Sequence, residues 1–127
     1  MSEQTYVNVT GNKAEISFGE KWTGLNLRIK TNSKVVQRVE VKAGEESFEA
    51  TGSGEGNNMI LQRKFDSLQK AVATFTYESD GSFKPSKLRS GGPYDIGTYR
   101  LLVVVAENGD DADFNDIVFE FSGHGQK

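Results

Sequence analysis

The chain has 127 residues, of which 35% are hydrophobic and 10% aromatic, enough for one compact domain with a buried core and too few for two. A formal net charge of -3 and a pI near 5.2 give no basic field for nucleic acid or an anionic membrane surface, so neither is an expected partner. Cysteine is absent, which excludes disulfide bonds, thiolate catalysis and zinc-thiolate sites.

The N-terminal segment MSEQTYVNV lacks the basic start and the apolar stretch of a secretory signal, and no run of 18 or more apolar residues occurs in the chain. We therefore expect a protein made in soluble form, whose export would need an unconventional route. No internal repeat or linker interrupts the sequence. Residues 1–127 are accordingly expected to form a single domain.

Apolar residues recur mainly at every second position, in short runs separated by Gly, Asn, Ser and Asp, which is typical of strands and turns. In residues 25–30, LNLRIK, for example, large apolar side chains alternate with polar ones, as on a half-buried strand. This pattern predicts strands over residues 6–9, 14–18, 25–30, 35–41, 47–50, 59–65, 71–77, 99–106 and 117–121.

The strand predicted at residues 99–106 is apolar on both faces, so we place it centrally in the sheet or at a subunit contact. Fourteen glycines supply turns, and the number and spacing of the strands predict an all-β fold, an antiparallel β-sandwich of about nine strands and Greek-key type. Only residues 65–73, FDSLQKAVA, are compatible with a short peripheral helix. Residues 89–93 are expected to form a surface loop.

The connection between the last two predicted strands, ENGDDADFND, carries five carboxylates in ten residues: Glu107, Asp110, Asp111, Asp113 and Asp116. Neighbouring carboxylates repel by about 1 kcal/mol per pair even in water, and more inside a protein. A solvated acidic turn is one explanation, and a cation-binding loop is the other. The alternation of Asp111, Asp113 and Asn115 favours the cation, because a curled loop offers ligands from alternate residues.

Calcium suits this segment best, since it takes about six to eight oxygen ligands, whereas magnesium needs a tighter octahedron and zinc prefers His or Cys. The chain offers only His124 for zinc. The segment is not an EF-hand, because Asp116 and Ser122 stand where that motif needs Gly and Glu. Two calcium ions would balance four of the carboxylates, those of Glu107, Asp111, Asp113 and Asp116.

Paired carboxylates also serve glycosidases, where an acid and a second carboxylate face each other across a cleft. Carboxylates this close in sequence form a cation cage more readily than two cleft walls. No aromatic platform opposite them can be placed from the sequence, and Trp22 is expected to pack beside a strand instead. A glycosidase is therefore the third hypothesis, behind two calcium-binding ones.

The run ENGDDADFND followed by a strand resembles the calcium loop of the fucose-binding lectin II family, whose pattern is approximately E-D-G-x-D-x-D-Y-N-D. Upstream, TNSKVVQRVEVKAGEES, a glycine-rich turn and Asn57-Asn58 resemble the family's asparagine, specificity loop, strand and N-N pair. The resemblance extends from about residue 27 to the C-terminus. It implies a nine-stranded antiparallel sandwich that binds two adjacent calcium ions, to which hydroxyls of fucose or mannose coordinate directly.

The resemblance also implies roles for individual residues. One calcium would be held by Glu107, Asp111, Asp113 and Asp116. The other would be held by Asp113, Asn115, Asp116 and the backbone carbonyl of Asn32. Contacts with the sugar would come from Ser33, Lys34, Asn108, Asp111, Asp113, Asn115 and Asp116.

Two departures from the family pattern bear on the sugar. Asn108 stands where the family commonly has an aspartate, so a charged hydrogen bond to the sugar becomes a neutral one. In the specificity loop, the hydroxyl of Ser33 resembles that of fucose-preferring members, while Lys34 and Val35 are bulkier than the usual residues.

The sequence therefore predicts a calcium-dependent carbohydrate-binding domain without enzymatic activity, with fucosylated or mannosylated glycans as partners and a homodimer or larger assembly. The alternative is a calcium-stabilised structural or adhesion module that meets no sugar. Family members end in a glycine whose carboxylate joins the partner subunit's second calcium. This chain ends in SGHGQK, so we expect a dimer in which the second calcium binds more weakly. Asn57 and Asn58 are expected to satisfy a turn, and His124 is not expected to bind metal.

Overall fold

The structure is a computed structural model that describes residues 5–19, 22–107 and 116–125. These residues form strands and the turns that join them, and among them no helix is long and apolar enough to cross a membrane. The strands are β1 (Tyr6–Thr10), β2 (Lys13–Ser17), β3 (Trp22–Ala43), β4 (Glu46–Phe65), β5 (Lys70–Ser79), β6 (Ser82–Pro85), β7 (Lys87–Ile96), β8 (Tyr99–Glu107) and β9 (Ile117–Gly125).

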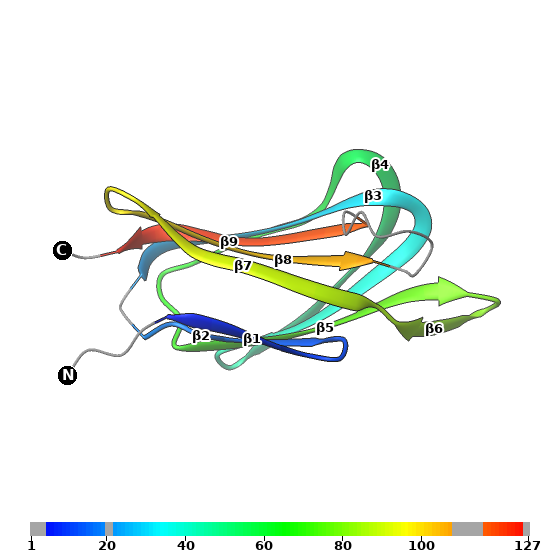
Figure 1. Ribbon diagram of the computed structural model, residues 1–127, viewed down its shortest axis with the longest axis horizontal. Coiled ribbons are helices and arrows are strands. Elements are labelled where there is room, and N and C mark those ends of the chain that lie inside the picture. Colours follow the sequence, from blue (N-terminus) through cyan, green and yellow to red (C-terminus); the bar gives the residue numbers. More distant parts are fainter. Residues whose placement is uncertain (1–4, 20–21, 108–115, 126–127) are drawn as a thin grey trace.

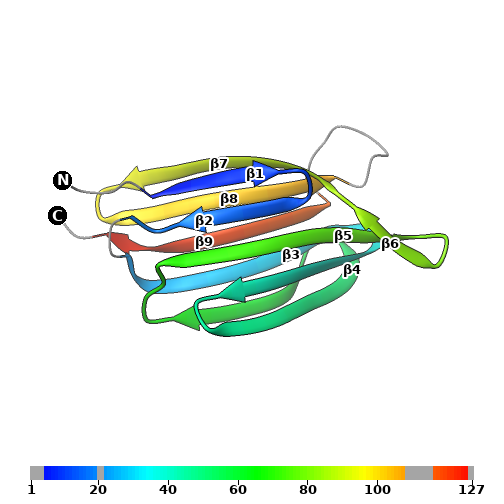
Figure 2. The same cartoon turned by 90° about the horizontal axis from the view of Figure 1, so that it is seen from below.

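All the paired strands are antiparallel, in the order β1-β2-β5-β3-β9-β8-β7, with β4 added to β3 and β6 added to β5. Figure 1 shows two layers, with β8 and β9 in one and β1, β2 and β5 in the other. β1 and β7, the two ends of the order, lie against each other (Figure 2), so the sheet nearly closes on itself. The predicted all-β, nine-stranded antiparallel sandwich is confirmed.

The two layers are joined by the long strands β3 and β4, which curve round one end of the sandwich (Figure 1). The first part of β3 pairs with β9, up to Thr31, and the later part pairs with β5, from Gln37 onward. From Ile29 to Gln37 the β3–β4 register shifts three times, and such bulges bend a strand and increase its twist. Each long strand therefore joins two segments that the sequence predicts as separate strands.

Three stretches differ from the prediction. Residues 65–73 do not form a helix, because the buried Ala71 and Ala73 alternate with the half-buried Val72, a period of two that places them on β5. Residues 89–93 belong to β7, paired with β8, and Pro93 falls within the register irregularity between Gly91 and Tyr94, where no ladder hydrogen bond is lost. The short strand β6 was not predicted either.

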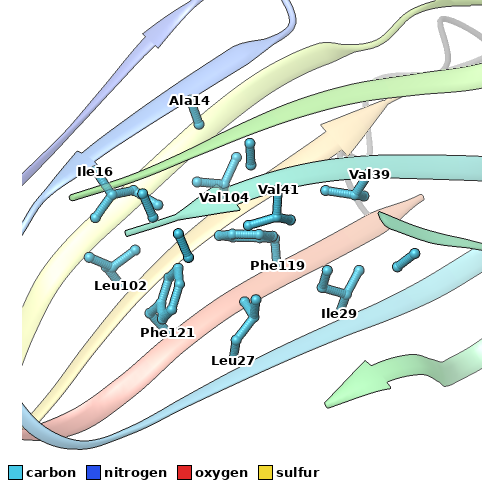
Figure 3. Close-up of a cluster of buried hydrophobic side chains, with 14 of the residues drawn as sticks. Ala14, Ile16, Leu27, Ile29, Val39, Val41, Leu102, Val104, Phe119 and Phe121 are labelled. Carbon is cyan, nitrogen blue, oxygen red and sulfur yellow. The ribbon is translucent and has the colours of Figure 1, made fainter. Parts of the chain in front are cut away.

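The core lies between the layers and is built from alternate residues of both (Figure 3). Phe119 packs edge-on against Phe75 of the other layer, with ring centroids 5.5 Å apart, and against Phe121 at 5.4 Å. Trp22 is 1% exposed and packs against Phe18, which confirms a packing role in place of a sugar platform. Aromatic packing of this kind joins β9 to β5 of the other layer.

Candidate calcium and sugar-binding site

The acidic connection starts and ends in the middle of one layer. β8, which carries it, lies between β7 and β9, so its predicted central place is confirmed. Its inward side chains are buried and its outward ones, such as Val103 and Val105, are half-buried. The last cross-strand pair before the connection is Ala106 with Ile117. The connection therefore leaves the layer at the end of the sandwich where β3 and β4 curve (Figure 1).

Two carboxylates stand at the base of this connection. Glu107 follows Ala106 and Asp116 precedes Ile117, the last pair of β8 and β9, so the two residues occupy facing positions at the ends of these strands. Glu107 is 1% exposed and Asp116 is 8% exposed. Burying a carboxylate costs several kcal/mol unless positive charge or hydrogen bonds offset it. Hard oxygen donors placed this way suit calcium, and the residues present therefore fit that ion.

Asn32 lies beside this pair. The Asp116 N–H donates to the Ala106 carbonyl at 3.0 Å, and the Asn32 N–H donates to the Asp116 carbonyl, also at 3.0 Å. Asp116 is thus fixed between β8 and β3. Three of the six residues expected to bind metal lie near one another: Asn32 on β3, Glu107 at the end of β8 and Asp116 just before β9.

The other expected ligands and one expected sugar contact lie outside the described residues: Asn108, Asp111, Asp113 and Asn115. Within the part of the chain that is described, no three His, Cys, Asp or Glu side chains cluster. This follows from the acidic connection itself, since only its two ends, Glu107 and Asp116, belong to that part.

The expected specificity loop lies on the curved part of β3. Lys34 is exposed and Val35 is half-buried, whereas Ser33 is 8% exposed. The Ser33 hydroxyl oxygen accepts a hydrogen bond from the Val35 N–H at 3.1 Å, and the Gln37 side-chain amide donates to the Val35 carbonyl at 3.1 Å. Because a hydroxyl has one hydrogen and two lone pairs, the Val35 bond does not exhaust what Ser33 can offer a ligand.

Asn57 takes part in the site more closely than the sequence indicated. The Asn32 Nδ2 donates to the Asn57 Oδ1 at 2.7 Å, and the Asn57 N–H donates to the Asn32 Oδ1 at 2.6 Å. The adjacent Asn58 instead donates to the Ser53 carbonyl at 2.9 Å. The pairing of Thr31 with Asn58 places Asn57 next to Asn32, but the register shifts between the turn at residues 44–45 and these residues hide that pairing from the sequence.

The far end of β9 lies away from this site. His124 is exposed there, 5.8 Å from Tyr99 between ring centroids, and the Gly125 N–H donates to the Thr98 carbonyl at 2.7 Å. A strand rises about 3.3 Å per residue, so Gly125 is roughly 26 Å from the start of β9. Gln126 and Lys127, on which the expected C-terminal contribution falls, lie outside the described residues.

Surface hollows among the described residues occur elsewhere. One lies beside the β3–β4 turn, at Gly44 and Leu68, and another lies over β3 and β5, at Lys42 and Thr74. The first is lined by no carboxylate, and the second is lined by Glu40 and Glu49, each of which forms an ion pair with Arg38. The candidate site is therefore defined by the base of the acidic connection and not by a preformed hollow in the described residues.

Comparison with known proteins gives a consistent result. The sequence model of the family described as "Fucose-binding lectin II (PA-IIL)" matches residues 16–125. Among curated protein sequences no relative matches.

Among solved structures, the fold is similar to the Chromobacterium violaceum lectin CV2L in complex with α-methyl-fucoside, with a TM-score of 0.67, 22% identity and coverage of 90% of this chain and 96% of that one. It is also similar to a Ralstonia solanacearum high-affinity mannose-binding lectin, with a TM-score of 0.64, 20% identity and coverage of 95% and 96%. A third similar structure is the C-terminal domain of the Burkholderia cenocepacia lectin BC2L-C, with a TM-score of 0.57, 15% identity and coverage of 96% of this chain and 97% of that one. Likenesses at these identities establish the fold.

Proposed function

The chain belongs to the fucose-binding lectin II family, and from this premise we propose that it is a calcium-dependent lectin that binds fucose- or mannose-type sugars through two adjacent calcium ions. Its family and its structural relatives are lectins, which bind sugars without transforming them, so no catalytic residue is assigned. The observation that carries the proposal is the meeting of Asn32, Glu107 and Asp116 at the base of the acidic connection.

The metal ligands of the proposal divide into two overlapping sets. Glu107, Asp111, Asp113 and Asp116 would hold one ion, and Asp113, Asn115, Asp116 and the Asn32 carbonyl would hold the other. The ions would supply positive centres to which sugar hydroxyls bind. The position of Glu107 and Asp116 supports this assignment, because both lie at the base of the acidic connection and carboxylate oxygens are ligands that calcium prefers. The hydrogen bond from Asn32 to Asp116 supports it as well, since it brings β3 to the same place.

We expect L-fucose to bind more tightly than D-mannose. A related lectin is known in complex with α-methyl-fucoside and another is a mannose-binding lectin, which indicates this class of sugar. The Ser33 hydroxyl lies one residue from Asn32 and can donate its hydrogen to a ligand while accepting the Val35 N–H. Lys34, exposed beside it, and Asn108 would add polar contacts around the sugar.

Assembly as a homodimer is part of the proposal. Because β9 carries the chain roughly 26 Å from the acidic connection, a C-terminal carboxylate that serves as a calcium ligand must serve the site of another subunit. Dimerisation would then complete the second calcium site. Sedimentation velocity at several protein concentrations, with calcium and with EDTA, measures this directly.

A glycan array probed with and without calcium tests the function. We expect binding to fucosylated and mannosylated glycans in calcium and none in EDTA. Binding that is equal in both conditions would contradict the metal-dependent mechanism. A protein that calcium stabilises but that binds no glycan would be a structural or adhesion module instead.

A further inference from the structure

The backbone of β4 is unusual at Asn57. Its φ is 55°, in the left-handed region that residues other than glycine rarely adopt. Among the described residues, Asp80 is the other such case, and there the two-residue turn Asp80-Gly81 between β5 and β6 requires that conformation. Asn57 lies within a strand and closes no hairpin. Its conformation must therefore be compensated by local contacts.

The compensation comes from Asn32 on the neighbouring strand. The side-chain amide of Asn32 donates to the Asn57 Oδ1 at 2.7 Å and accepts from the Asn57 N–H at 2.6 Å, which closes a reciprocal pair. Gly56, with φ 78°, turns the chain just before Asn57 and so aims that N–H at Asn32. The left-handed backbone of Asn57 and its hydrogen bonds with Asn32 therefore accompany each other.

These bonds fix Asn32 from two directions. Its side chain is held by β4 through Asn57, and its N–H is held by the Asp116 carbonyl at 3.0 Å. With the N–H and both side-chain polar atoms engaged, the orientation of the adjoining peptide groups is set. The Asn32 carbonyl is the group that the proposed function assigns to calcium, and none of these contacts competes for it.

We propose that Asn57 is a positioning residue that holds the Asn32 carbonyl in place for the second calcium ion. The inference rests on the proposed function and deepens it. Calcium–oxygen distances fall within about 2.3 to 2.6 Å, so a carbonyl fixed beforehand binds the ion without a further ordering cost. Because only one of the two calcium ions is coordinated by Asn32 in this proposal, loss of the Asn57 side chain weakens the binding of that ion and leaves the binding of the other unchanged.

Three variants separate this role from a general effect on the fold. Asn57→Gly removes the side-chain acceptor while tolerating the left-handed backbone. Asn57→Asp keeps an oxygen that accepts from the Asn32 Nδ2. Asn58→Ala is the matched control, because Asn58 is adjacent but donates to the Ser53 carbonyl and not to Asn32.

The experiment is calorimetric titration of the apo protein with calcium chloride, with melting in EDTA as the check on folding. We expect native protein to bind two ions per subunit. In Asn57→Gly, one dissociation constant rises by about twofold to tenfold, the range of one neutral hydrogen bond, and the other is unchanged. Asn57→Asp and Asn58→Ala keep both constants within about twofold of native or tighter.

The possible failures are distinguishable. If the native protein binds no calcium, the proposed function falls and this inference falls with it. If native binds two ions and Asn57→Gly matches it in both constants, the inference alone is overturned. The inference is also overturned if Asn58→Ala or Asn57→Asp weakens calcium binding as much as Asn57→Gly does.

Discussion

The core of the sandwich and its curved end are held together by different interactions. In the core, Phe75, Phe119 and their neighbours are almost completely buried and contact each other through apolar surface. At the curved end, polar side chains make the contacts: the Asn32 amide bonds to both the side chain and the backbone N–H of Asn57, and the Ser33 hydroxyl accepts from the Val35 N–H. The core is therefore held together by apolar contacts, whereas the curved end presents polar groups, to some of which the proposed function assigns a bound ion.

This difference assigns stability to one region and binding to the other. Hydrophobic burial contributes in proportion to the apolar area removed from water and does not respond to calcium. Under the proposed function, carboxylates such as Glu107 and Asp116 would respond, because a bound calcium ion would interact with them directly. Substitutions in the two regions should therefore have separable effects.

The largest separation should come from the acidic connection itself. Asp113→Ala removes a ligand proposed to serve both ions, so we expect loss of calcium and sugar binding together. Asn108→Ala should retain calcium binding and weaken only sugar binding. Calorimetry with each ligand compares the two variants, and normal sugar binding by Asp113→Ala would show that the bridging ligand is misassigned.

A substitution in the core should lower the stability of the fold in the same way with and without calcium. Phe119→Ala leaves a cavity between the layers beside Phe75, and we expect a loss of about 3 to 5 kcal/mol in the free energy of unfolding. Urea denaturation measures it. The loss should be the same in calcium and in EDTA, and a loss that appears only in calcium would mean that core and site are not separable.

Calcium should stabilise the native protein by an intermediate amount. An ion present at 100 times its dissociation constant adds about 2.7 kcal/mol per independent site, because it binds the folded state selectively. Differential scanning calorimetry should therefore show a higher melting temperature in calcium than in EDTA. Identical melting curves in calcium and in EDTA would contradict the proposal that Glu107 and Asp116 bind calcium.

The smallest effect should be on the choice of sugar. Ser33→Ala removes a hydroxyl beside Asn32, and one neutral hydrogen bond is worth about 0.5 to 1.5 kcal/mol. We expect the ratio of fucose to mannose affinity to shift toward mannose by up to about tenfold. Ser86→Ala, at a buried serine outside the site, is the control and should keep the native ratio. An unchanged ratio in Ser33→Ala would assign the choice to Lys34 and Val35.

Much of the fold could be predicted from the sequence, because strands with one buried face alternate apolar and polar residues. The errors fall where that alternation is weak or hidden. Residues 89–93 contain glycines and Pro93, which are typical of loops, yet β8 pairs with them. The curved part of β3 could not be predicted as one strand, since its inward positions are the buried polar residues Thr31, Ser33 and Gln37, so that the apolar alternation stops after Ile29 although the alternation of burial continues.

Some features of the site could likewise be predicted from the local sequence, and others could not. Glu107 and Asp116 could be singled out as candidate ligands because carboxylates cluster in this segment of the sequence, and the structure places both at the base of the connection. The contact between Asn57 and Asn32 could not be read from local spacing, because it depends on the register of two strands paired over a long distance. Hydrogen bonds across such a ladder follow from the fold as a whole.

Binding of methyl α-L-fucoside in calcium and in EDTA, measured by calorimetry on samples whose melting is followed in parallel, tests most directly that the sugar site depends on calcium while the core does not. We predict binding in calcium, none in EDTA, and a cooperative melting transition in both. Equal fucoside binding in the two conditions would contradict the account.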